Sequence, residues 1–517
     1  MRYIRKIPKG RALNEPLLYA DHPRPVTRRQ LLSAGLISGA ATVLVPLLPR
    51  TARADVKADL GGLGITNCGL QGGAGMVPFI AFDLSGGANI AGSNVLIGKA
   101  GGQHDFLTAA GYSKLGLPGN MTPNLPGFID QSFGLAFHSD SALLRGMKLR
   151  ARSGATAAGT NGSILAARSE NDTANNPHNP MYGIAKTGAR GELLTLIGSE
   201  SSDSGGNSVA PAALMDPQIR PTKVDRSSDV TGLVDTGELG TLFSDPADAV
   251  SVMESMAVLT YRKQGHVSTG LAAGDDAGVK DFNKCGYVKS AYLAEKFNNP
   301  AALNPDVDPL IVGPAGIWSQ AEYNGNSEYR KTAAVMKMVI DGNAGAGTIQ
   351  MGGFDYHTGD RATGESRDQL AGECIGACLE YAARTQRPLM IYVFSDGSLS
   401  SSGMIDNSTG GRGKGVWTGD NQSTAATFML VYRPGAPVQM MADAGVARNQ
   451  IGYFTADGSV ATSAFPGANA VNLLVYTVIL NYLALHGRVG DFATLFPGSG
   501  LGSPAQLDAL TAFAPVV

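Results

Sequence analysis

Three short polar segments of this sequence contain Asp83, Asp355 and Asp396. Each of them follows an apolar run that is typical of a buried strand. In open α/β sheets, ligands bind at the carboxyl ends of the strands, so the side chains of these segments are expected to converge. Carboxylate oxygens and imidazole nitrogens bind divalent cations such as zinc, calcium, magnesium or manganese. We therefore predict a site for one such cation. Its predicted ligands are Asp83, Asp355, His357 and Asp396.

The most specific part of this pattern is the pair formed by Asp355 and His357. In an extended segment, residues two apart point the same way, so both side chains could reach one ion. The alternative is that the pair lies on a surface turn and binds nothing. Asp420 is a further candidate ligand outside this set.

Ser85 is the candidate nucleophile, because it ends the first apolar run and precedes Gly86 and Gly87. Backbone amides in such a turn can hold an anion. No G-x-S-x-G motif surrounds Ser85, which argues against a serine hydrolase of the α/β-hydrolase type. The simpler alternative is that the serine and the glycines only form a tight turn between a strand and a helix.

The elements that must position these residues are predicted from apolar periodicity. Near-continuous apolar runs indicate strands that are covered on both faces, and stripes at helical spacing indicate helices between them. Such alternation predicts an α/β fold with a central, mostly parallel sheet between helices. The predicted strands are Met76–Leu84, Leu193–Ile197, Thr348–Met351, Leu389–Phe394 and Thr427–Tyr432, and the helices include Glu365–Arg384 and Val471–His486.

Domain organisation is predicted from composition along the chain. Residues 1–54 are expected to be removed, and 55–517 to form a single α/β domain. Within it, residues 199–345 begin with a Ser-, Asp- and Gly-rich stretch and continue with helical patterns. We expect this region to be a loop-rich helical elaboration of the domain.

The first 54 residues have the features of a twin-arginine (Tat) export signal. Arg28 and Arg29 precede a mildly apolar run, and Ala52-Arg53-Ala54 supplies a small-x-small cleavage site. The run is interrupted by glycine, serine and proline, so a stable transmembrane span is not expected. We therefore expect the Tat export machinery as a partner, and the periplasm, the cell surface or the medium as the destination.

Charge and cysteine content bound the function further. The segment 1–54 holds ten Lys and Arg but two Asp and Glu, while the whole chain carries a net charge of −2, so the exported chain is acidic. An acidic protein is not expected to bind nucleic acid.

Cys374 and Cys378 lie four apart on one helical face, which indicates core packing. The alternative is a disulfide from Cys68 or Cys285 to one of them.

The segments Gly352 to His357 and Val393 to Gly397, with Ser85-Gly86-Gly87 and the export signal, resemble a large family of Tat-exported bacterial proteins of unknown function. That family is distantly related to the alkaline phosphatase and sulfatase superfamily. The resemblance implies an alkaline-phosphatase-like sheet with a helical insertion. It also implies Asp and His ligands around one or two metals, beside a Ser or Thr nucleophile.

Departures from the family pattern leave two functions open. Asn89 lies where an Asp is common, residues 415–421 hold no histidine, and a Ser-His-Phe-like motif is replaced around Asn161 to Ser163. The preferred interpretation is a degenerate metal site in a binding or assembly module of a secretion or cell-surface system, with an extracytoplasmic protein partner. The alternative is a metal-dependent hydrolase of phosphate or sulfate esters, in which Arg412 or Lys414 holds the anion.

Overall fold

The computed structural model describes residues 75–169, 176–234, 246–297 and 299–517. The predicted export signal and Cys68 lie outside these residues. The chain divides into two compact units. The larger unit consists of residues 69–235 and 299–517, and the smaller unit of residues 1–68 and 236–298.

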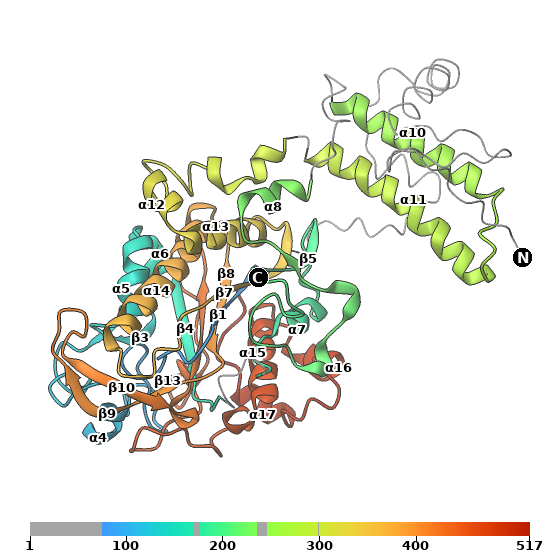
Figure 1. Ribbon diagram of the computed structural model, residues 1–517. Coiled ribbons are helices and arrows are strands. Elements are labelled where there is room, and N and C mark those ends of the chain that lie inside the picture. Colours follow the sequence, from blue (N-terminus) through green and yellow to red (C-terminus); the bar gives the residue numbers. More distant parts are fainter. Residues whose placement is uncertain (1–74, 170–175, 235–245, 298) are drawn as a thin grey trace, which may run out of the picture. The chain divides into compact units, whose positions relative to one another are not determined.

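The larger unit is built on a sheet of eight strands among its described residues, in the order β14-β4-β11-β8-β1-β7-β5-β6 (Figure 1). Neighbouring strands are parallel except where β11 pairs with β4 and β8. The fold is therefore α/β with a mostly parallel sheet, as predicted. The strands are β1 (Phe79–Leu84), β4 (Thr160–Leu165), β5 (Leu194–Gly198), β6 (Thr222–Lys223), β7 (Ala344–Met351), β8 (Leu389–Ser395), β11 (Thr427–Tyr432) and β14 (Gln450–Ile451).

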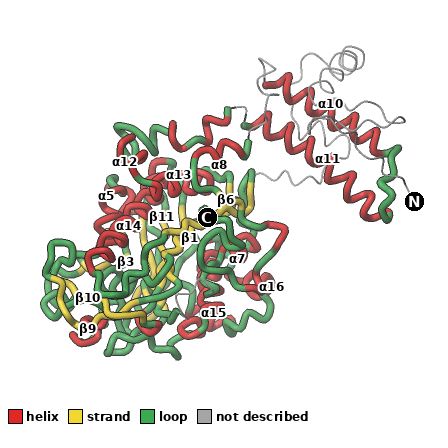
Figure 2. The backbone as a smooth tube through the Cα atoms, viewed as in Figure 1, coloured by secondary structure: helices red, strands yellow, loops and turns green. Residues whose placement is uncertain are grey.

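Helices cover both faces of this sheet (Figure 2). Side chains that alternate along β7 contact a helix on each face. A methyl group built on Gly347 would lie 2.7 Å from Val335 of α13 (Ser327–Ile340). The next residue, Thr348, points the other way, toward Met181 of α7 (Met181–Lys186). Because both faces are covered, every residue of the central strands β1, β8 and β11 is buried. This burial accounts for their non-alternating apolar sequences.

Two further helices border the region of the predicted site. Helix α14 (Arg361–Arg384) follows the Gly352–His357 segment and packs against α5 (Ala142–Arg150).

Cys374 and Cys378 of α14 are free and fully buried. This agrees with the core-packing interpretation and not with the disulfide alternative.

The smaller unit is described over residues 246–297. Helices α10 (Pro246–Gln264) and α11 (Ala273–Lys296) pack against each other in it, and Cys285 of α11 is disulfide-bonded. The predicted elaboration 199–345 is divided between the two units. Its middle part belongs to the helix pair, and residues 199–234 and 299–345 belong to the α/β unit.

Helix α15 (Val471–Leu485) is the apolar helix predicted near the carboxyl end of the chain. Twelve of its residues are buried in the α/β unit, which explains its composition. Among the described residues, no helix combines the length and the apolar character needed to cross a membrane.

Candidate metal centre

Three adjacent parallel strands deliver the predicted ligands to one edge of the sheet. β1 lies between β8 and β7, and Asp83 is in register with Phe394 of β8 and Gln350 of β7. Asp396 follows β8 directly, and Asp355 lies in the loop after β7. The segments therefore begin at one edge of the sheet, but of the four predicted ligands only Asp355 and His357 lie at metal-binding spacing.

The structure brings Asp355 and His357 together with Asp420. One ligand atom from each of these three residues lies within 4.8 Å of the other two. His357 Nδ1 contacts Asp355 Oδ1 and lies 3.4 Å from Asp420 Oδ1. The side chains are 27% (His357), 63% (Asp355) and 49% (Asp420) exposed, so the group opens to solvent. Among the described residues, it is the one cluster of acidic, histidine or cysteine side chains with metal-binding spacing.

Asp420 reaches this group because of a β-hairpin. β9 (Leu399–Asp406) and β10 (Lys414–Asp420) pair antiparallel beside the main sheet, and Asp420 is the last residue of β10. Two carboxylates and an imidazole suit zinc or manganese, and a more oxygen-rich set would favour calcium or magnesium. The donor set therefore fits a single divalent cation.

Asp83 is outside this group and is buried under the loop that follows β5 (Leu194–Gly198). Its Oδ2 accepts hydrogen bonds from the backbone amides of Asn207 (2.8 Å) and Ser208 (2.7 Å). Burial and, to a smaller extent, nearby Asp396 raise the pKa of the Asp83 carboxyl to about 7, against the lowering effect of the hydrogen bonds from Asn207 and Ser208. The Oδ1 atom of Asp83 accepts the Ser208 hydroxyl at 3.2 Å, so the loop holds both carboxylate oxygens.

Asp396 is also outside the group and is fully buried. Its Oδ1 accepts the backbone amide of Gly86 at 2.8 Å, and its Oδ2 lies 3.4 Å from the side-chain amide nitrogen of Asn207. Asp83 and Asp396 are therefore both held by protein donors, and Asn207 contacts both carboxylates. The four predicted ligands divide into a solvent-facing pair, Asp355 and His357, and a buried pair.

Ser85 lies at the turn after β1, and its hydroxyl accepts a hydrogen bond from Gln350 Nε2 at 3.0 Å. The backbone amide of Gly86 in this turn donates to the Asp396 carboxyl. Gly86 has φ +129°, and a methyl group built on it would lie 2.5 Å from the backbone nitrogen of Asp355. The glycine is thus required by the close approach of the Asp355 loop, which supports the tight-turn interpretation.

A polar cavity of about 590 Å³ adjoins the group at Asp420. Arg168 supplies a cation to its wall, and its Nη2 donates to Gln422 at 2.9 Å. The hydroxyl of Ser169 is buried there and has no hydrogen-bond partner in the described part of the chain. The lining residues are Arg168, Ser169, Gly397, Ser398, Asp420, Asn421, Gln422 and Ser423.

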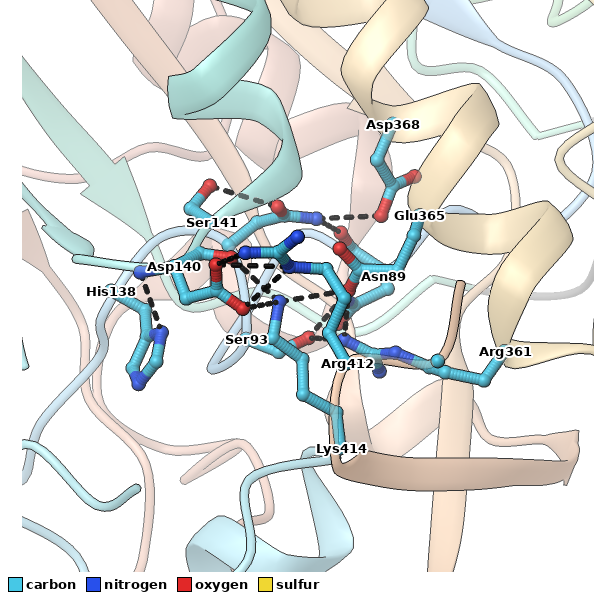
Figure 3. Close-up of polar contacts among 12 residues, drawn as sticks. Asn89, Ser93, His138, Asp140, Ser141, Arg361, Glu365, Asp368, Arg412 and Lys414 are labelled. Carbon is cyan, nitrogen blue, oxygen red and sulfur yellow. Dashed lines mark hydrogen bonds and ion pairs between the residues drawn. The ribbon is translucent and has the colours of Figure 1, made fainter. Parts of the chain in front are cut away.

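Lys414 and Arg412 do not line this cavity, contrary to their expected role as an anion clamp. Lys414 is fully buried, and its ammonium lies 2.8 Å from Glu365 Oε1, 2.6 Å from the Asp140 carbonyl and 3.2 Å from Asp140 Oδ2 (Figure 3). The guanidinium of Arg412 also bonds Asp140, with Nε 2.9 Å from Oδ2. Their charges are thus used to fasten the β9–β10 hairpin to the core.

Comparisons with protein-family models, with curated proteins and with solved structures find no match to this chain.

Proposed function

We propose that this chain is an extracytoplasmic binding or assembly module that holds one divalent cation at Asp355, His357 and Asp420. The observation that carries the proposal is the spacing of these ligands, which places three ligand atoms within 4.8 Å. Three protein ligands leave coordination positions open for solvent or for a group of a partner molecule. The cation would then link the protein to an acidic or carbonyl-bearing partner surface.

The arrangement of Asp83 and Asp396 supports a reduced site over a two-metal hydrolytic centre. Two-metal sites place their ions about 3.5–4 Å apart and need ligands for both. Here the buried carboxylates accept backbone amides of Gly86, Asn207 and Ser208. The residues present therefore fit one cation and do not fit two.

Export by the Tat pathway belongs to the same proposal. Arg28 and Arg29 and the cleavage-site pattern support it, and the disulfide at Cys285 is of the kind that persists in oxidising compartments. We infer a location in the periplasm or at the cell surface, with a protein of a secretion or cell-surface system as the partner.

The proposal is tested by calorimetric titration of the exported chain with Zn²⁺, Mn²⁺, Ca²⁺ and Mg²⁺. We expect saturable binding of one ion, and a loss of at least about tenfold in affinity for His357→Ala and for Asp420→Asn, or about 1.4 kcal/mol. His104→Ala is the matched control, because His104 is an exposed histidine outside the group. Wild-type protein that binds none of the four ions would overturn the proposal.

A second candidate function is a metal-dependent phosphate- or sulfate-ester hydrolase. The observation that favours it is the 590 Å³ cavity, which both Arg168 and Asp420 line. Arginine is suited to bidentate contacts with phosphate or sulfate oxygens. Turnover of chromogenic phosphate or sulfate esters that requires metal and disappears in His357→Ala would establish this activity and exclude a purely binding role.

A further inference from the structure

Tyr356 lies between two of the ligand residues but faces the opposite way. Its side chain is 3% exposed, whereas the side chains of Asp355 and His357 reach solvent. The loop after β7 thus directs Tyr356 into the interior and its two neighbours toward solvent. Any constraint on the Tyr356 side chain therefore constrains the backbone that carries both ligands.

The hydroxyl of Tyr356 is fixed by two hydrogen bonds. It accepts the backbone amide of Asn89 at 2.9 Å and donates to Asp368 Oδ1 of α14 at 2.6 Å. The other carboxylate oxygen of Asp368 accepts the side-chain amide of Asn94 at 2.7 Å. These groups are buried, so water does not compete for the bonds and the tyrosine is held in one position.

The hairpin that carries Asp420 is fixed to the same helix. Lys414 of β10 bonds Glu365 at 2.8 Å, and the guanidinium of Arg361 lies 4.6 Å from the centre of the Trp417 ring. Arg361 also bonds Glu365 at 2.7 Å. Figure 3 shows Glu365 and Asp368 extending from one side of α14, as expected for residues three apart in a helix.

We propose that this face of α14, formed by Arg361, Glu365 and Asp368, sets the position of the loop that carries two of the ligands relative to the hairpin that carries the third. In this arrangement Tyr356 is a positioning residue for the metal centre. The inference rests on the proposed function, since it concerns the same cation. Removal of groups that orient metal ligands typically lowers metal affinity about 10- to 100-fold. Tyr356→Phe removes the hydroxyl and leaves the three ligands in place.

The matched control is Tyr329→Phe. The hydroxyl of Tyr329 donates to Glu373 of α14 at 2.6 Å, which is the same kind of buried bond to the same helix. Tyr329 and Glu373 are not among the ligand-bearing segments. A merely structural role of Tyr356 would therefore make the two variants alike in every measurement.

The experiment is a titration of the wild-type chain and both variants with Mn²⁺, followed by the electron paramagnetic resonance spectrum of the bound ion. We expect Tyr356→Phe to lower the affinity about 10- to 100-fold and to broaden the spectrum, and Tyr329→Phe to change neither. Equal affinities and spectra for wild type and Tyr356→Phe would overturn the inference.

A second measurement separates failure of this inference from failure of the proposed function. Hydrogen exchange on metal-free protein should be faster at residues 352–359 in Tyr356→Phe than in wild type or Tyr329→Phe. If wild type binds no Mn²⁺, the proposed function fails, and the exchange result still decides whether Tyr356 positions the loop. Unchanged exchange in that segment would exclude the positioning role.

Discussion

His357 Nδ1 lies 3.4 Å from Asp420 Oδ1, although the two residues are far apart in the sequence. His357 belongs to the loop after β7, and Asp420 ends the β9–β10 hairpin beside the main sheet. Both segments are bonded to α14, through the Tyr356–Asp368 and Lys414–Glu365 contacts. The candidate metal centre therefore involves this helix as well as the strand ends.

Asp83→Asn is predicted to reduce the pH dependence of stability. Burial raises the pKa of Asp83 to about 7 in the folded protein. The contribution of the Asp83 carboxyl to stability is therefore complete below its unfolded-state pKa near 4 and is lost as the pH rises through about 7. Each unit of difference between the folded and unfolded pKa corresponds to about 1.4 kcal/mol. Asparagine can still accept the amides of Asn207 and Ser208 and cannot ionise.

Urea denaturation at pH 5 and pH 8 checks this prediction. The free energy of unfolding should fall less between these values in Asp83→Asn than in wild type. An equal fall in the two proteins would show that Asp83 does not titrate in this range.

Gly86→Ala is predicted to destabilise the fold and to disturb the metal centre. Alanine at φ +129° is strained, and its methyl group would lie 2.5 Å from the Asp355 backbone nitrogen. Such strain costs about 1–3 kcal/mol before the steric clash is added. We expect thermal denaturation to show the loss, with Gly119→Ala as the control, because a methyl group built on Gly119 meets nothing within 4 Å. Equal melting temperatures for the two variants would contradict the prediction.

Lys414→Met is predicted to lower the free energy of unfolding by about 3 kcal/mol. Removing one partner of a buried ion pair costs about 3–5 kcal/mol, and the lower end applies because Arg145 and Arg361 still pair with Glu365. Lys99→Met is the control, since Lys99 forms an exposed pair with Asp105. Guanidinium denaturation compares the variants, and a loss no larger than that of the control would refute the buried network as a stabilising element.

The state of the cysteines predicts a thiol count. Cys374 and Cys378 are free and buried, and Cys285 is disulfide-bonded. We expect a thiol reagent to modify two cysteines of the chain in denaturant, four after reduction, and few in the native protein. Four reactive thiols without reduction would show that the chain contains no disulfide. The argument from Cys285 for an oxidising compartment would then be lost.

The secondary structure was largely predictable because its signals are local. The run Thr427–Tyr432 forms a strand with the predicted bounds, and Phe79–Leu84 lies within its predicted run. β4 (Thr160–Leu165) was missed, because Asn161, Gly162 and Ser163 give it no apolar run. Its place in the sheet comes from pairing with β11 and β14, which are remote in the sequence.

The sequence alone determined the strand ends at which Asp83, Asp355 and Asp396 emerge, because burial on both faces of a sheet leaves a readable apolar pattern. Only the tertiary structure decided which of these carboxylates face solvent. Loop amides from Asn207 and Ser208 cover Asp83, and the hairpin brings Asp420 to His357. Those arrangements depend on contacts between distant segments, and no local pattern of residue types encodes them.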